Sequence, residues 1–340
     1  MQEIKTILCS IMLFISLTFT YSQNKINKLF ESQETLALKL SFSNKKVKKT
    51  NDSTYIDTEL YYKTESSEWV SFPLNLRARG NFRRNTCYFP PIKMKISKSV
   101  SKETLFKGNK KLKLVLPCKN EKDLNDNIIK EYLAYKLYEI ISPYHFQTRL
   151  VDIQFREVKG KKAKDFELKG FLIEDDKKVA KFHDGKVFER FIHPLAMDAD
   201  TSVQNALFQF MIGNTDFSVA YQHNGKLLYI DKKILPLPYD FDMSGLVNAS
   251  YSVANETLGI TSVTQRVYRG FKRDESLMQK IRQQFLDKKN EIIDTVKSLE
   301  KEFDIAKEYN QALSFVESFF TIIESDASFK SKILMKARTK

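Results

Sequence analysis

Few residues in this chain are of the types that build metal centres. Its 340 residues include three cysteines and four histidines, and the histidines are scattered. A structural zinc site needs four cysteine or histidine ligands at characteristic spacings. We therefore expect no zinc site.

Several sequence signatures are also missing. No segment carries the repeated glycines with which nucleotide-binding loops wrap phosphates. The chain has no helix-turn-helix, zinc-finger or RNA-binding pattern, so we expect no sequence-specific contact with nucleic acid. It contains no tandem repeat, low-complexity tract or flexible linker.

Long apolar runs are confined to the start of the chain. Residues 1–22 combine a lysine, an apolar stretch over residues 7–19 and small residues before the expected cleavage point, which is typical of a secretory signal peptide. No other stretch approaches the roughly 20 apolar residues that cross a membrane. We expect an exported protein (periplasmic, cell-surface or extracellular) with no transmembrane segment in the mature chain.

Export bears on the two cysteines that remain after the signal peptide. Disulfides form in oxidising compartments, which makes Cys87 and Cys118 candidates for a bridge. Two buried free thiols are the alternative.

Positive charge is in excess. Lysine and arginine number 56 against 42 aspartates and glutamates, for a net charge of +14. This surplus favours anionic partners, namely a nucleotide and an acidic protein or an anionic cell-surface acceptor. Solubility alone is the alternative explanation for the charge.

The periodicity of apolar residues predicts an α+β protein. Residues 23–190 are expected to form a strand-rich N-terminal lobe, and residues 191–340 a mostly helical C-terminal lobe. A helix is expected over residues 125–141, and the chain is expected to be helical from residue 275. Residues 45–51 are predicted as a basic turn. Strands are expected at residues 35–42, 54–62, 70–79, 92–96, 111–116, 150–158, 166–174 and 226–230.

Residues 211–245 concentrate oxygen-bearing side chains in short loops. An apolar helix pattern precedes them, and a strand and an apolar segment separate the two acidic loops. Carboxylates and amide oxygens suit a hard divalent cation, although Asn and Asp are also ordinary loop formers. The residues concerned are Asn214, Asp216, Asn224, Asp240 and Asp242.

Several blocks of this sequence occur in an order that resembles the spore coat protein H (CotH) kinase family. They are RGNFRR at 79–84, FPP at 89–91, EYLAYKLY at 131–138, IGNTD at 212–216 and PYDFD at 238–242. The chain looks most like a group of uncharacterised secreted bacterial CotH-like proteins, over residues 36–273.

This resemblance implies an atypical protein-kinase-like fold of two lobes with a cleft between them. It implies transfer of the ATP γ-phosphoryl group to a protein or small acceptor with Mg²⁺ or Mn²⁺. Asp216 would take the acceptor proton, and Asp240, Asn224 and Asp242 would hold the ion.

The lysine that would contact the nucleotide has several candidates. Position in the resemblance favours Lys181 held by Glu174, with Lys186 second. Lys113 with Glu131 is a further pair, because its strand-to-helix spacing is like that of ordinary kinases. Each lysine alone is also compatible with a solvated surface charge.

Arg79, Arg83 and Arg269 are candidates for phosphate or substrate contact, since guanidinium groups match phosphate geometry. A structural salt-bridge turn is the alternative for the first two. Two further function classes stay open for the whole chain: a catalytically inactive kinase-like binding protein, and an envelope or coat assembly protein.

Overall fold

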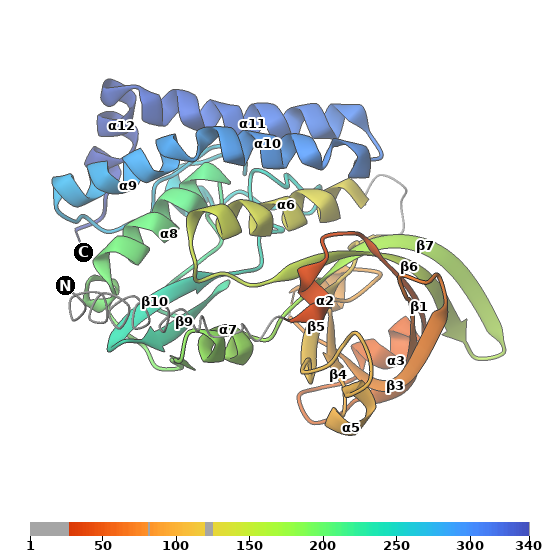
Figure 1. Ribbon diagram of the computed structural model, residues 1–340. Coiled ribbons are helices and arrows are strands. Elements are labelled where there is room, and N and C mark those ends of the chain that lie inside the picture. Colours follow the sequence, from red (N-terminus) through yellow and green to blue (C-terminus); the bar gives the residue numbers. More distant parts are fainter. Residues whose placement is uncertain (1–26, 81, 120–124, 340) are drawn as a thin grey trace, which may run out of the picture.

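Seven strands close into a barrel that forms the first part of the fold (Figure 1). The computed structural model describes residues 27–80, 82–119 and 125–339, so the expected signal peptide at 1–22 lies outside the described residues. The order around the barrel is β1-β2-β3-β4-β5-β7-β6, and the parallel pairing of β1 with β6 closes it. The strands are β1 Leu36–Phe42, β2 Ile56–Lys63, β3 Trp69–Ala78, β4 Ile92–Lys95, β5 Lys111–Val115, β6 Thr148–Lys159 and β7 Lys162–Ile173.

Alternating side chains fill the barrel interior. On β3, Leu74, Leu76 and Ala78 are buried, while the side chains between them are more exposed. The β6–β7 hairpin is longer than predicted, and its turn is reduced to residues 160–161, where Gly160 has a φ of +64°. Among the described residues, the short helix α2 Lys28–Glu31 precedes the barrel, and α3 Asn44–Lys48, α4 Phe82–Thr86 and α5 Lys98–Ser101 connect its strands.

The prediction of a basic turn at 45–51 was wrong. Helix α3 occupies most of that segment, because Ser43 caps it by accepting a hydrogen bond from the backbone N–H of Lys46 and Val47 packs into the barrel core. A single buried apolar side chain is enough to organise this short basic segment.

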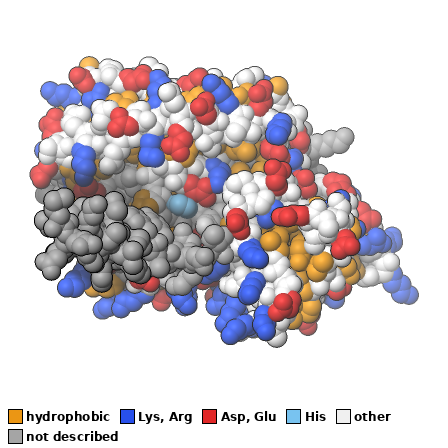
Figure 2. Space-filling model, viewed as in Figure 1, with side chains coloured by type: hydrophobic (Ala, Val, Ile, Leu, Met, Phe, Trp, Pro, Cys, Tyr) orange, Lys and Arg blue, Asp and Glu red, His pale blue; other side chains and the backbone are white. Residues whose placement is uncertain are grey.

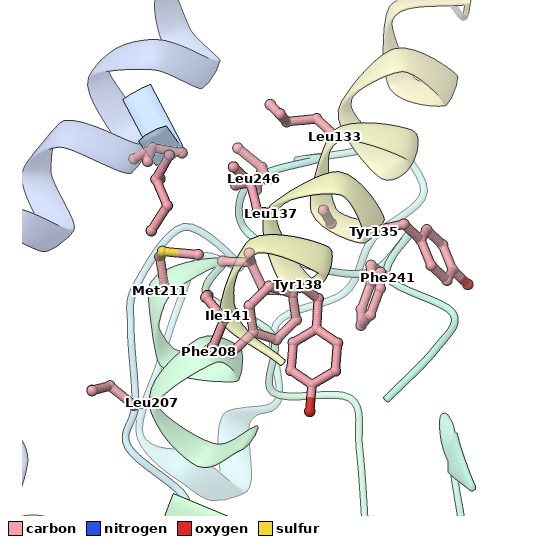
Figure 3. Close-up of a cluster of buried hydrophobic side chains, with 14 of the residues drawn as sticks. Leu133, Tyr135, Leu137, Tyr138, Ile141, Leu207, Phe208, Met211, Phe241 and Leu246 are labelled. Carbon is pink, nitrogen blue, oxygen red and sulfur yellow. The ribbon is translucent and has the colours of Figure 1, made fainter. Parts of the chain in front are cut away.

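The long helix α6 (Asn125–Ile141) lies between the barrel and the helical part of the molecule (Figure 1). Its residues are buried on several sides, because it contacts β7 of the barrel and also α10 and α11. Figure 3 shows its apolar side chains meeting those of α8 and Phe241. The helix therefore connects the barrel to the second hydrophobic core.

The remaining chain builds a three-stranded sheet under a helical layer (Figure 1). The sheet order is β10-β9-β8. The elements are α7 Asp176–Phe182, β8 Lys186–Val187, α8 Ala199–Met211, β9 Gly225–Ile230, β10 Lys233–Pro238, α9 Glu275–Asp287, α10 Lys289–Ser298, α11 Ala306–Glu324 and α12 Asp326–Lys332, with 3-10 turns at Pro194–Ala196, Glu256–Leu258, Glu300–Glu302 and Leu334–Lys336.

The α+β class is confirmed, with strands dominating the first part and helices the second. The closed barrel is an addition that the strand pattern alone does not predict. Within the described ranges, no helix is both long and apolar enough to span a bilayer. On the face in Figure 2, acidic and basic side chains are interspersed over the helical layer, and apolar side chains show on the barrel.

Cys87 and Cys118 are joined by a disulfide, which decides between the two alternatives left by the sequence. The bridge ties the segment after α4 to the end of β5, and both residues are buried. It closes a loop across a sequence separation of 31 residues.

We expect the double variant Cys87→Ala/Cys118→Ala to lose about 3–4 kcal/mol of unfolding free energy, because the open chain regains the entropy that the closed loop removes. Urea unfolding followed by circular dichroism measures this. A reducing agent should destabilise the wild type and leave the double variant unchanged. Equal sensitivity of both proteins to reductant would contradict a stabilising bridge.

Candidate functional site

The two acidic loops predicted from the sequence are bonded to each other. The loop after α8 and the loop after β10 are joined by hydrogen bonds from Gly245 N to Gly213 O (3.1 Å) and from Leu246 N to Ile212 O (2.9 Å). Gly213 ends α8 with a φ of +63°, and a Cβ on Gly245 would lie 2.5 Å from the carbonyl oxygen of Val263. Glycine is therefore required at both ends of this junction.

The β9–β10 hairpin brings Asn224 and Asp240 to one end. Gly225 pairs with Pro238, so Asn224 directly precedes one strand and Asp240 closely follows the other. Both residues have positive φ, 47° and 66°, a conformation that costs energy outside glycine and is often found at functional sites. The hydroxyl of Tyr135 on α6 accepts a hydrogen bond from Asp240 N at 2.9 Å, which fixes this turn.

Asp216 is held by its own loop while its carboxylate stays accessible. Its backbone N–H donates to Asn214 Oδ1 at 2.9 Å. Asn224 Nδ2 donates to Asp216 Oδ2 (2.9 Å), and His223 Nε2 lies 2.9 Å from Oδ1. The Asp216 side chain is 44% exposed. It is oriented by an amide and an imidazole, and a hydroxyl-bearing molecule can still reach it.

Arg269 supports this loop from behind. Its guanidinium donates to the carbonyl oxygens of Thr215 and Phe217, the latter at 2.9 Å, so it grips the backbone on both sides of Asp216. The predicted contact of Arg269 with a phosphate or substrate stays a prediction. Its hydrogen bonds position the Asp216 loop.

A buried ionic cluster lies next to the second acidic loop. Arg83 on α4 is 3.4 Å from Glu131 on α6 and 3.6 Å from Asp242, and it donates to Leu116 O at 2.7 Å. Tyr251 donates to Asp242 at 3.2 Å. The side chains of Arg83 and Asp242 are each 6% exposed. Arg83 therefore forms the salt bridges that the sequence left as one alternative, and its contact with a phosphate stays a prediction.

Positive and negative charges in this cluster do not balance. Burial raises the pKa of Glu131 to about 8, with a further contribution from Asp242, although Arg83 opposes it. Burial likewise raises the pKa of Asp242 to about 6, and Asp240 adds to the shift. One guanidinium cannot neutralise two buried carboxylates, so the pair tends to retain a proton near neutral pH.

Two further cations lie beside this cluster. Arg79 is 3.9 Å from Asp240, and its Nε is buried without a hydrogen-bond partner in the described chain. The Lys113 ammonium on β5 is also buried and, among the described residues, has no hydrogen-bond partner. It packs over the rings of Phe146 (4.5 Å) and Tyr239 (4.8 Å). Burial, and then Arg79, lower the pKa of Lys113 to about 8.

The oxygen donors of the two acidic loops can hold a divalent cation only if a bound molecule supplies further oxygens. Within ranges 27–80, 82–119 and 125–339, no three His, Cys, Asp or Glu side chains group as a metal site. Asp240 and Asn224 lie at one end of the hairpin, and Asn224 makes its side-chain hydrogen bonds through Nδ2, which keeps Oδ1 for a cation. Phosphate oxygens commonly complete such a partial set.

Lys181 and Lys186, the lysines that the resemblance favours, do not pair with Glu174. Glu174 is buried, accepts a hydrogen bond from Gln147 N at 2.6 Å and has its pKa raised to about 7 by burial. Lys181 is exposed on α7, and Lys186 is exposed with its ammonium 5.3 Å from the Tyr229 ring. The described residues contain no ion pair of Glu174 with either lysine.

Glu174 and Lys181 instead line a cavity of about 1020 Å³ that contains no residue of the acidic loops. Its wall is rich in lysine, from α2, the segment before β5, and α7. Asp216, Asp240 and Asp242 therefore lie outside this cavity. The lysines are Lys28, Lys107, Lys110, Lys111, Lys177, Lys178 and Lys181.

Sequence reasoning missed Tyr135 and Tyr251, the two hydroxyls that bind Asp240 N and the Asp242 carboxylate. For Tyr135 a signal was present, since it follows Glu131 by four residues and so shares its helix face. Tyr251 lies in an irregular segment, where spacing gives no such information.

Comparison with known proteins identifies no relative: no family model matches the chain, and no curated protein sequence is significantly similar to it.

We expect Asp242→Asn to stabilise the metal-free protein above pH 6 by roughly 2 kcal/mol, since a folded-state pKa raised from 3.8 to about 6 costs stability as pH rises through that interval. Glu131, raised from 4.5 to about 8, extends the wild-type decline towards pH 8. Urea unfolding between pH 4 and 8 in a chelator measures both.

Asp294→Asn on the exposed face of α10 is the matched control, and it should follow the wild-type pH profile. A parallel pH dependence of Asp242→Asn and the wild type would show that the Asp242 carboxyl carries no such cost.

Proposed function

We propose that this protein is a divalent-cation-dependent phosphotransferase that moves the γ-phosphoryl group of ATP to a hydroxyl-bearing acceptor. The observation that carries the proposal is the hydrogen-bonded pair of acidic loops, which lies beside the buried Lys113 ammonium and Arg79 Nε, two donors without a hydrogen-bond partner in the described chain. Buried donors of this kind are costly, and a polyphosphate supplies acceptor oxygens and negative charge.

The order of elements along the chain supports the proposal. Protein kinases carry a lysine on a strand, a glutamate on the next helix, an aspartate and an asparagine in the catalytic loop, and a metal-binding aspartate after a hairpin. Here the same order is given by Lys113 on β5, Glu131 on α6, Asp216 and Asn224 after α8, and Asp240 after β10. We include in this proposal that the chain is CotH-like and that it has two lobes with a cleft between them.

In the proposed reaction, Asp216 orients the acceptor hydroxyl and takes its proton. The acceptor oxygen forms a bond to the γ-phosphorus while the bond to the β-phosphate oxygen breaks, and ADP leaves. His223 and Asn224 keep the Asp216 carboxylate in place. The positive charge of the chain favours an acidic protein or an anionic cell-surface acceptor.

Asp240 and Asn224 would hold Mg²⁺ or Mn²⁺. The Asp242 side chain is more buried than that of Asp240. A bound divalent ion neutralises phosphate charge in the transition state. Lys113 and Arg79 are the buried cations available to phosphate oxygens. Because the Glu131–Asp242 pair tends to keep a proton, added positive charge at this point lowers the pKa of the pair and favours release of that proton.

One contact favours a second candidate, a catalytically inactive kinase-like binding protein. Glu131 pairs with Arg83 at 3.4 Å and forms no ion pair with Lys113. Active kinases need the lysine–glutamate pair in place. Binding without transfer is the outcome that this candidate predicts.

We expect ATP with Mg²⁺ or Mn²⁺ to raise the unfolding temperature of the wild type by about 3–5 °C at saturating ligand. Asp240→Ala should lose most of this rise, because it removes a carboxylate ligand of the ion. Differential scanning fluorimetry, with ATP in chelator as the blank, measures the shift.

Asp216→Asn is the matched variant. It should keep the ATP-dependent rise and reduce transfer by about 10²–10⁴-fold, since it removes only the base. If neither the wild type nor Asp216→Asn is stabilised by metal and ATP, the phosphotransferase proposal fails. If both proteins bind ATP equally and the wild type transfers no phosphoryl group, the protein is the catalytically inactive binding protein.

Lys113→Met should weaken ATP binding by about 10–100-fold, the range for loss of a charge-assisted contact. Lys181→Met and Lys186→Met, which remove exposed ammonium groups, should bind as the wild type does. Titration with a fluorescent ATP analogue distinguishes the three. Weakened binding in Lys181→Met alone would restore the Glu174–Lys181 assignment.

A further inference from the structure

A small cavity of about 30 Å³ lies between α8, residues 269–273 and the C-terminal segment. Three arginines line it, and its lining includes no acidic side chain. The C-terminal segment is fixed there by backbone hydrogen bonds from Arg338 N to Gly270 O (2.9 Å) and from Lys272 N to Arg338 O (2.8 Å). The cavity is therefore built by segments far apart in the sequence.

Among the described residues, the hydrogen-bond acceptors of these arginine side chains are backbone carbonyl oxygens. Arg269 donates to Thr215 O and Phe217 O, and Arg273 donates to Leu195 O and Pro194 O at 3.0 Å and to Met197 O at 3.2 Å. Neutral carbonyls accept hydrogen bonds but do not cancel charge. Among the described residues, no carboxylate forms an ion pair with Arg269, Arg273 or Arg338.

Arg338 is the least satisfied of the three. Its Nε is buried without a hydrogen-bond partner in the described chain, and its guanidinium packs over the Phe271 ring at 4.2 Å. Burial, and then the positive charge of Arg269, lower the pKa of Arg338. Ser202 Oγ and Asn205 Oδ1 on the α8 wall also lack partners among the described residues.

Like charges gathered around a small cavity are costly, and a bound anion reduces that cost. About 10–15 Å³ of such space holds one water molecule, so about 30 Å³ accepts a compact anion and excludes a nucleotide. We propose that Arg269, Arg273 and Arg338 form a binding site for a compact oxyanion such as inorganic phosphate, distinct from the proposed nucleotide site.

Such a site acts on the Asp216 loop through Arg269. The guanidinium that faces the cavity also grips the carbonyl oxygens on both sides of Asp216. An anion that orders Arg269 thereby orders the loop. Occupancy of the cavity is a means by which phosphate concentration stabilises the loop, whether or not the protein transfers phosphate.

The experiment measures the unfolding temperature of the purified protein in phosphate and in phosphate-free buffer of equal ionic strength. We expect phosphate to raise the wild-type value by roughly 2–4 °C. Arg338→Met should lose this rise, and in phosphate-free buffer it should unfold at or above the wild-type temperature, because an uncompensated buried charge has been removed. Sulfate and chloride in place of phosphate test whether the site requires an oxyanion.

Two controls separate this site from the others. Lys336→Met removes an exposed cation of the same segment and should keep the full phosphate effect. Lys113→Met should also keep it, which distinguishes the cavity from the proposed nucleotide site. Equal stabilisation of the wild type and Arg338→Met by phosphate, or no stabilisation of either, overturns the proposal. A response to chloride equal to that to phosphate overturns the oxyanion class.

Discussion

The buried ion pairs of Arg83 are the constraint on which the site depends. This one guanidinium links α4 beside the barrel, α6 and the second acidic loop through Glu131 and Asp242. Removing Arg83 would leave two buried carboxylates without their shared counter-charge, and stranding a buried charge in this way costs about 3–5 kcal/mol. The relative positions of barrel, helix and loop are therefore set together by one charge.

The charged side chains around Arg83 do not satisfy one another fully. Arg79 and Arg83 face Glu131, Asp240 and Asp242, while the Lys113 ammonium lies on aromatic rings nearby. Such groups cannot all be charged and all be satisfied by one another in a medium of low dielectric constant. These groups lower the stability of the fold but can bind a charged ligand, a combination that is common at functional sites.

Local structure was largely predictable from the sequence, because it depends on nearby residues. The helix at 125–141 and the strands around residues 74, 113 and 228 follow directly from periodicity. The closing of the barrel was not predictable, because it depends on β1 pairing in parallel with β6, more than 100 residues away. The joining of the acidic loops was expected in outline, but the Gly213–Gly245 contact that achieves it was not.

The choice among lysines shows why sequence order alone was insufficient. Lys113 and Lys181 are both lysines near a carboxylate in the chain, yet β5 buries the first ammonium and α7 exposes the second. Arg269 shows the same limit, because its guanidinium donates to backbone carbonyls of the Asp216 loop, a contact that sequence order does not reveal. Burial of a charge arises from tertiary packing, which no local pattern contains.

Closing the barrel has a consequence for association with other chains. Every barrel strand has a neighbour on both sides over at least part of its length. The longest stretch with a neighbour on one side only is residues 162–170 of β7, and its charged side chains discourage an incoming strand. The outer strands of the small sheet are guarded differently: β8 is only two residues long, and β10 carries Pro236 and Pro238, which have no N–H to donate. In the part of the chain that the structure describes, barrel closure, edge charge, a short strand and prolines thus each limit the backbone that is open to edge-to-edge pairing.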